Sequence, residues 1–412
     1  MVISGLEMES CPDCYANIIT STDTQLIVNI RSGPNGEEIS VADEGLAADI
    51  IYGGIGTYND PFVIENIELK DLPANGLLIR DIDSFLLIKD FTFKNLGKGN
   101  RSSMPVGIGT QYAKNVRVEN CTALSGESFR LSYSENVSVK NCTGRNILFE
   151  GVKNGLIDDC TSNCILIKGL MSPFYSYKLL DPMYDFFNDT LLGQRDDDLA
   201  VSQSCIIKNC ERLAEIDIFD AEDCIVENCS IEGIGLWMMN AKNVTFLNST
   251  FGNATLSLDW SRKISFENMT LINSTISLAG SIPEDYAIVF KNSTIDGRPI
   301  YYYENQSDLE IKDLNAGYIS LVNCPGAKIE GINALGIFVA NSDGAIVKNS
   351  RLGWAGIHIA FSSNCAFSNN TLINQKSKDE IMQYAVCNNN TVSGNVVIKE
   401  TENLSLDLSQ LI

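Results

Sequence analysis

The six residues VRVENC at 116–121 are a clear copy of a short pattern that recurs along most of this chain. Close copies are VSVKNC at 137–142, IIKNC at 206–210 and IVENC at 225–229. Each has alternating apolar residues, then Asn, then in most copies Cys or Ser. The residue after the Asn falls at positions 121, 142, 210, 229, 249, 269, 293, 324, 350 and 370. A period close to 20 residues indicates a repeat architecture (~20–50 residues per repeat).

Alternation within each copy predicts a strand, because side chains on a strand change face at every residue. A leucine-rich repeat would show a leucine consensus, which this chain lacks. Short strands separated by Asn and Gly turns are instead typical of a parallel β-helix, in which stacked coils share one core. The recurring Asn then stacks on itself at a corner, where it tolerates left-handed backbone. The sequence therefore predicts an all-β solenoid.

Three segments resemble the NosD-like family of right-handed parallel β-helix repeat proteins, which is common on archaeal cell surfaces. They are GIGTYNDPFVIEN at 54–66, IDGRPIYYY at 295–303 and AGYISLVNC at 316–324. The resemblance covers roughly residues 50 to 400 and implies a right-handed parallel β-helix. It implies little about activity, since the family includes binding modules, surface-layer parts and sugar-active enzymes.

Two segments lack the repeat. Residues 1–52 are expected to form an N-terminal cap, with a helix between 37 and 51 covering the first coil of a β-helix that spans 53–412. Residues 169–200 are expected to be an insertion on the side of the solenoid. Its aromatic residues are the predicted lateral contact for self-assembly, because large apolar side chains on a protruding loop favour a partner. They include Phe174, Tyr175, Tyr184, Phe186 and Phe187.

The charge balance excludes several partners. The chain has 30 Lys and Arg against 52 Asp and Glu, a net charge of −22, so nucleic acid is an unfavourable partner. No apolar stretch approaches the ~20 residues of a membrane span. The N-terminal segment lacks the features of a signal peptide, and an extracellular location therefore presumes that a leader precedes this numbering. The chain has a single histidine, His358. This argues against a histidine-rich metal site and against a Ser-His-Asp triad.

Nine of the thirteen cysteines fall into two columns, which favours a ladder of small buried thiols. The column just after the Asn corner has Cys121, Cys142, Cys160, Cys210, Cys229 and Cys324, and the second has Cys205, Cys224 and Cys365. Stacked neighbours ~4.8 Å apart also lie within disulfide reach, so disulfides stay open as an alternative. Cys11 and Cys14 form a lone CxxC, for which a local or intermolecular disulfide is at least as plausible as zinc. The disulfide candidates are Cys11, Cys14, Cys121, Cys142, Cys205, Cys224, Cys210 and Cys229.

Asn-x-Ser/Thr sequons are frequent. Part of the reason is the repeat itself, in which a corner Asn is often followed two residues later by Ser or Thr. Corner residues such as Asn120 and Asn228 are expected to be buried in the ladder and unmodified. The predicted glycan acceptors lie at coil edges or loops. They are Asn100, Asn136, Asn243, Asn253 and Asn305.

Catalysis on polysaccharides would need paired carboxylates on one outer face. The weak candidates are Asp196, Asp197 and Asp198, in a run that faintly resembles the DDCIAI segment of polygalacturonase-type enzymes. The GHG segment of those enzymes is absent, and AEID at 214–217 stands in its place. His358 alternates with apolar neighbours, which favours a structural role.

A lyase-like interpretation would place calcium on Asp196–Asp198 or Asp223, with Arg195 or Lys208 as base. Nothing in the spacing favours it, so no cofactor is expected. Aromatic platforms for sugars are conceivable at Trp237, Trp260, Trp354 and Tyr301–Tyr303, although filling of coil corners or contact with partner subunits is favoured.

The leading hypothesis is a secreted, non-catalytic cell-envelope protein. It would be a self-assembling subunit of an archaeal surface layer or sheath. Its expected partners are further copies of the same chain and surface polysaccharide. The alternative is a polysaccharide-active β-helix enzyme, a glycoside hydrolase or lyase, or a carbohydrate-binding module. Neither interpretation involves a nucleic acid.

Overall fold

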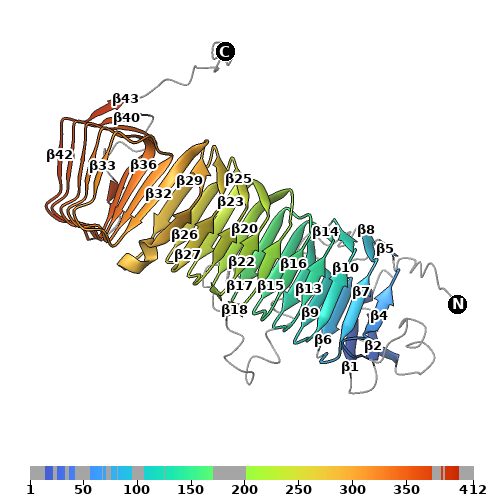
Figure 1. Ribbon diagram of the computed structural model, residues 1–412. Coiled ribbons are helices and arrows are strands. Elements are labelled where there is room, and N and C mark those ends of the chain that lie inside the picture. Colours follow the sequence, from blue (N-terminus) through green and yellow to red (C-terminus); the bar gives the residue numbers. More distant parts are fainter. Residues whose placement is uncertain are drawn as a thin grey trace, which may run out of the picture. The chain divides into compact units, whose positions relative to one another are not determined.

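The computed structural model is all-β and consists of stacked coils of parallel strands, as the repeat predicts (Figure 1). The residues that it describes are 14–21, 26–32, 37–41, 56–66, 68–70, 76–80, 82–94, 106–124, 126–169, 201–373, 382–383 and 386–398. The predicted contact residues 174–187, the run Asp196–Asp198, Cys11 and Asn100 lie outside these ranges. The chain divides into two compact units, Met1–Ser261 and Arg262–Ile412.

Unit 1 has two main parallel sheets. The first, which we call the broad sheet, has the longer strands. It comprises β6 (Leu77–Arg80), β9 (Val106–Gln111), β12 (Glu127–Ser132), β15 (Asn146–Glu150), β17 (Cys164–Lys168), β20 (Leu213–Phe219), β23 (Ser230–Met239) and β26 (Thr255–Asp259). The second, the narrow sheet, comprises β4 (Phe62–Glu65), β7 (Leu86–Lys89), β10 (Val116–Glu119), β13 (Ser138–Lys140), β16 (Leu156–Asp158), β19 (Ile206–Lys208), β22 (Ile225–Glu227) and β24 (Thr245–Leu247).

Shorter strands of unit 1 occupy the remaining sides of the coils. They are β5 (Glu68–Lys70), β8 (Thr92–Lys94), β11 (Thr122–Ala123), β14 (Thr143–Gly144), β18 (Ser202–Gln203), β21 (Ala221–Glu222) and β25 (Thr250–Gly252). Each strand pairs in parallel with its counterpart one coil away, as in Arg117 beside Ser138. Alternate side chains point inward, and Val116 and Val118 are fully buried. Burial of such a side chain contributes about 1.5–3 kcal/mol.

Unit 2 is also built mainly from parallel strands. Its strands are β27 (Ile264–Glu267), β28 (Thr270–Ile272), β29 (Thr275–Ala279), β30 (Ile288–Lys291), β31 (Thr294–Ile295), β32 (Arg298–Glu304), β33 (Glu310–Lys312), β34 (Tyr318–Val322), β35 (Lys328–Glu330), β36 (Asn333–Ala340), β37 (Ile346–Lys348), β38 (Arg351–Ala360), β39 (Ala366–Ser368), β40 (Thr371–Ile373), β41 (Met382–Gln383), β42 (Thr391–Ser393) and β43 (Val396–Ile398). A short 3₁₀ helix, Pro283–Tyr286, packs Tyr286 on Phe338, with ring centroids 5.5 Å apart. Among the described residues, no helix is long and apolar enough to cross a membrane.

The N-terminal segment is built from strands where a helix was expected. β1 (Cys14–Ser21), β2 (Leu26–Ser32) and β3 (Glu37–Val41) form an antiparallel set, and β1 pairs in parallel with β6 of the solenoid. The predicted helix is therefore wrong over 37–41, and residues 42–51 are not described. The reason is that β6 leaves an open strand edge, whose backbone N–H and C=O groups another strand can pair and a helix cannot.

The Asn corners are confirmed as ladders. Asn120 and Asn141 both have left-handed backbone, with φ of 55° and 48°. The Asn141 side-chain amide donates to Asn120 Oδ1 at 2.8 Å, and Asn228 donates to Asn209 Oδ1 at 3.2 Å. The expectation that Asn120 and Asn228 are buried is wrong, since both are exposed. The ladder forms on the surface, where each exposed side-chain amide reaches the Asn one coil away.

The eleven cysteines from Cys121 to Cys387 are free thiols, most of them buried in the core. Cys121 and Cys142 stack one coil apart, and the Cys121 backbone N–H donates to the Cys142 sulfur at 3.3 Å. The Cys205 and Cys229 thiols donate to backbone carbonyls of the preceding coil. The thiol ladder accounts for the columns in the sequence, and the disulfide alternative stays a prediction.

Candidate functional site on the broad sheet

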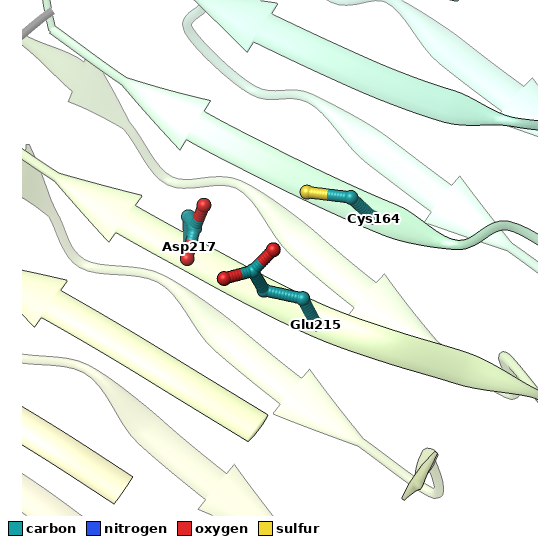
Figure 2. A group of neighbouring side chains, drawn as sticks. All are labelled: Cys164, Glu215 and Asp217. Atoms are coloured by element: carbon teal, nitrogen blue, oxygen red, sulfur yellow. The ribbon is translucent and has the colours of Figure 1, made fainter. Parts of the chain in front are cut away.

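A cluster of three polar side chains lies on the outer face of the broad sheet. Cys164 on β17 pairs in register with Glu215 on β20, and Asp217 follows two residues later on the same face. The Cys164 sulfur and carboxylate oxygens of Glu215 and Asp217 all lie within 4.8 Å of one another. Figure 2 shows the three side chains gathered over two neighbouring strands.

The local sequence explains why these side chains face outward. In LAEIDIF, residues 213–219, Ile216 and Ile218 point into the core and are fully buried. Alternation therefore places Glu215 and Asp217 on the opposite face. A strand that carries two carboxyls at adjacent outward positions concentrates negative charge on one small area of the sheet.

Asp217 is the unusual member of the cluster. It is only 3% exposed although it lies on the outer face. Its register neighbours are apolar, Leu166 on β17 and Trp237 on β23. The Oδ1 atom of Asp217 has no hydrogen-bond partner. An ionised carboxylate is very unfavourable in such a place, and the group relieves the penalty by holding a proton.

The pKa values of the cluster follow from this environment. Burial, together with the charge of Glu215, raises the pKa of Asp217 to about 8. Burial also raises the pKa of Glu215. The Cys164 thiol pKa is raised by burial and by the two nearby carboxylates. At neutral pH the site thus presents a protonated Asp217 next to Glu215, two carboxyls in different states, which is how acid and base roles are separated in active sites.

A bulge in β23 shapes the next coil. Leu213 pairs with Ile231 and Glu215 pairs with Gly235, so three residues of β23 oppose one residue of β20. Gly235 has φ of +115°, and a Cβ there would lie 2.4 Å from the Thr255 carbonyl oxygen. Only glycine fits there, so the bulge depends on Gly235. Bulges are frequent next to active sites because they redirect side chains.

Trp237 and Asp259 extend the cluster. The Trp237 indole N–H donates to Asp259 Oδ2 at 3.2 Å, and its ring meets Phe219 edge-on at 5.1 Å. Burial raises the pKa of Asp259, against the effect of its hydrogen bonds from Trp237 and Ser257. Trp237 is half-buried, so part of its ring is open to a ligand. An aromatic ring beside paired carboxyls is a combination suited to a sugar ring.

A second polar cluster occupies the same face further toward the N-terminus. The Glu150 carboxylate accepts from Arg130 and from Lys168, both at 2.9 Å. Burial alone would raise the pKa of Glu150, but the charges of Arg130 and Lys168 outweigh it and hold the pKa below its usual value. Unlike Asp217, Glu150 is therefore ionised and fully paired. We interpret this cluster as structural.

Other sequence-predicted residues are dispersed. Asp223 accepts from Asn243 at 2.6 Å at a coil corner, and Lys208 pairs with Asp158 at 3.4 Å on the narrow sheet. The two therefore do not meet in one lyase-like site. His358 is 7% exposed, and burial lowers its pKa to about 4. That agrees with the structural role expected for it. Tyr301 and Tyr303 pack against the core of unit 2.

The cluster itself was not predicted from the sequence. Glu215 and Asp217 were noticed only as a departure from another family's pattern, although their outward alternation within LAEIDIF could have identified them. Cys164 belongs to neither cysteine column. It reaches Glu215 only because residues 169–200 interrupt the coil period between them, a relationship that the sequence alone does not show.

The three side chains could also hold a divalent cation, since a thiolate and two carboxylates are a plausible donor set. Metal binding requires deprotonated ligands. All three groups have raised pKa values, which works against a resident metal. The donor set fits a proton-holding site better than a metal centre.

Four of the predicted glycan acceptors are described, and all four are exposed corner residues with left-handed backbone. The side-chain nitrogens of Asn136, Asn243 and Asn253 donate to Asn115, Asp223 and Glu232, respectively. Asn305 differs, because its Oδ1 accepts from Asn323 while its Nδ2 donates to none of the described residues.

We therefore expect Asn305 to be the preferred acceptor among these four in a glycosylating host. A glycan on the other three would remove a ladder hydrogen bond, worth about 1 kcal/mol. Peptide mapping by mass spectrometry checks this, with Asn305→Gln as the matched control. Occupancy of Asn136 above that of Asn305 would contradict the ladder argument.

No protein-family profile and no curated protein matches this chain. Several solved structures resemble it. The Streptococcus pneumoniae surface adhesin PfbA is 11% identical with a TM-score of 0.37, covering 81% of this chain and 91% of that one. A Thermotoga maritima exopolygalacturonase is 9% identical with a TM-score of 0.26, covering 85% and 76%. A Yersinia enterocolitica exopolygalacturonase is 9% identical with a TM-score of 0.27, covering 90% and 83%. Likenesses this remote say nothing about activity. The fold and the cluster define a parallel β-helix protein with an unequal carboxyl pair on its broad sheet.

Proposed function

We propose that this protein is a polysaccharide-active β-helix enzyme, a glycoside hydrolase whose acid is Asp217 and whose nucleophile is Glu215. The observation that carries the proposal is the fully buried Asp217 with an unpartnered Oδ1 beside the half-buried Glu215. A carboxylic acid held neutral near pH 7 can donate a proton to a glycosidic oxygen. Its ionised neighbour can attack the anomeric carbon.

The spacing of the pair favours a retaining reaction. Retaining glycosidases have carboxyl groups about 5–5.5 Å apart, whereas inverting ones need about 6.5–9.5 Å to admit a water. Carboxylate oxygens of Glu215 and Asp217 lie within 4.8 Å. Asp217 would protonate the leaving oxygen as Glu215 forms the glycosyl bond. Asp217, now ionised, would then take a proton from the water that releases the sugar.

The test is release of reducing ends from a panel of neutral and acidic polysaccharides. Loss of a general acid or nucleophile lowers the rate by at least ~10²–10⁴-fold. We expect Asp217→Asn and Glu215→Gln each to cause a loss of this size. Glu211→Gln is the matched control, because Glu211 is an exposed carboxyl on the same coil that is outside the cluster. Activity that survives in both cluster variants would refute the proposal.

The pH dependence is a separate prediction. The pKa of Asp217 is raised to about 8, so the acid is lost as pH rises through that value. Glu215 must be ionised, so activity also falls at acid pH, at a limb placed above the ordinary glutamate range by burial. We expect kcat/KM to be bell-shaped with its basic limb near pH 8. A plateau extending to pH 10 would show that Asp217 is not the acid.

A second candidate is the envelope role, a self-assembling extracellular subunit of an archaeal surface layer or sheath. The stacked Asn and Cys side chains support it, because such stacking gives a stiff scaffold. The NosD-like resemblance supports it as well. The predicted contact is the aromatic insertion at residues 169–200. The double variant Phe186→Ser, Phe187→Ser tests it, with light scattering as the measure of assembly size. Assemblies that persist in this variant would remove the segment from the hypothesis, and absence of assembly in the unmodified protein would remove the role.

A further inference from the structure

Unit 2 contains a hollow of about 200 Å³ that is separate from the carboxyl cluster. Its lining residues come from β32, β36, β38 and β40. Its walls include Arg298, Asn333, Leu335, Arg351, Trp354 and Ile373. No acidic residue is among its described lining residues, although the chain as a whole carries a net charge of −22. A cationic hollow on so acidic a protein requires an explanation.

A bulge builds the hollow. Ala334 pairs with Leu352 and Gly336 pairs with Gly356, so Gly353, Trp354 and Ala355 of β38 oppose the single residue Leu335 of β36. A Cβ on Gly353 would lie 3.2 Å from Leu335, a contact close enough to favour glycine there. The extra residues place Trp354 among the residues that line the hollow. Bulges that redirect one side chain in this way are a feature of binding sites.

The strands place both arginines beside the hollow. Arg351 lies beside Asn333 in the parallel ladder. Arg298 begins β32, directly after a tight turn at Asp296 and Gly297, both of which have positive φ. Both arginines line the same hollow from different strands. Their convergence results from the fold and would not be expected from two unrelated surface residues.

Neither arginine has a counter-ion among the residues that the structure describes. The contrast with the lysines of unit 2 is clear. Lys312 and Lys328 pair with Glu310, at 3.3 and 3.7 Å, and Lys348 pairs with Glu330 at 3.2 Å. These three lysines thus form ladders with stacked acids, whereas the side chains of Arg298 and Arg351 donate to none of the residues that the structure describes. Two arginines that line one hollow, without a counter-ion among the described residues, are suited to bidentate binding of a carboxylate or sulfate.

We propose that this hollow binds an acidic sugar, a pyranose that carries a carboxylate or a sulfate. Arg298 and Arg351 bind the anionic group, Asn333 hydrogen-bonds ring hydroxyls, and the indole of Trp354 covers the apolar face of the ring. The hollow is smaller than the ~300–1,000 Å³ typical of drug-sized ligands, which matches one sugar unit. The inference does not depend on hydrolysis by Glu215 and Asp217, since it concerns other residues.

The test is titration calorimetry of the full chain with glucuronate, glucose 6-sulfate, glucose and acetate. We expect glucuronate or glucose 6-sulfate to bind, with the preferred one identifying the anionic group. Glucose should bind at least 10-fold more weakly because it has no charge, and acetate because it has no ring for Trp354. The proposal would be overturned if glucose bound as tightly as both charged sugars do. It would also be overturned if acetate bound as tightly as the preferred sugar does, or if neither charged sugar bound.

Variants localise the site. Arg351→Gln and Arg298→Gln should each weaken binding by about 10- to 100-fold, the factor expected for a lost charged hydrogen bond. Trp354→Ala should weaken sugar binding and leave acetate unaffected. Lys263→Gln is the matched control, because Lys263 is an exposed cation of the same unit that lines no part of the hollow. Unchanged affinity in both arginine variants, with circular dichroism that matches the unmodified protein, would contradict the assignment.

Discussion

The Asp217→Asn variant is expected to be more stable than the unmodified protein at pH 8, by on the order of a few kcal/mol. In the folded state burial and Glu215 raise the pKa of Asp217 to about 8, whereas in the unfolded chain the pKa is about 3.9. The folded state therefore binds more protons between these values. Stability contributed by Asp217 is fully present below about pH 4 and is lost as pH rises through about 8.

Asparagine removes this pH dependence because it never ionises. The difference in unfolding free energy between variant and unmodified protein should be near zero at pH 4 and should grow up to about pH 8. Urea unfolding at several pH values measures it, with the exposed Glu211→Gln expected to change stability by less than about 0.5 kcal/mol. A variant that is more stable and inactive would show stability given up for function. A variant destabilised at every pH would mean that the Asp217 carboxylate is stabilising.

Glu150→Gln is expected to have the opposite effect, a loss of about 3 kcal/mol at neutral pH. The Glu150 and Arg130 side chains are 5% and 7% exposed, and removal of one partner leaves the other buried without its charge. Such losses are about 3–5 kcal/mol. Because the folded pKa of Glu150 is lowered, its contribution is present above the unfolded value of about 4.3 and is lost as pH falls through the folded value.

The difference between Glu150→Gln and the unmodified protein should therefore shrink below about pH 4, the reverse of the Asp217 profile. The matched control is Glu222→Gln, which breaks the exposed pair with Lys242 at 3.2 Å. Exposed pairs of this kind contribute at most about 1 kcal/mol. Equal losses in the two variants would contradict the difference in burial on which the prediction rests.

The sequence was sufficient to predict the solenoid because its determinants are local and repeated. Alternation in segments such as 116–119 places the core side chains, and Asn at the corners adopts left-handed backbone. The cap was predicted with the wrong secondary structure. Residues 37–41 have no repeat to indicate a strand, and their pairing is decided by an open edge elsewhere in the fold, a tertiary effect that propensity does not contain.

The carboxyl cluster shows the other limit. That Glu215 and Asp217 share a face follows from alternation alone, but the burial of Asp217 depends on Leu166 and Trp237, which come from other coils. The hollow in unit 2 likewise joins Arg298 with Arg351, 53 positions apart in the chain. Which residues meet at each site depends on the strand register between coils, and bulges shift that register. The catalytic candidates predicted from the sequence, Asp196–Asp198, rested only on a local resemblance to the DDCIAI segment.

The central claim is that Asp217 holds a proton at neutral pH beside Glu215. The most direct measurement is a ¹³C NMR titration of the side-chain carboxyl, in protein labelled at Asp and with Asp217→Asn to assign the signal. The account predicts a midpoint near pH 8, which follows from burial and the charge of Glu215. A midpoint near 4, the ordinary value for aspartate, would contradict it and leave the cluster without an acid.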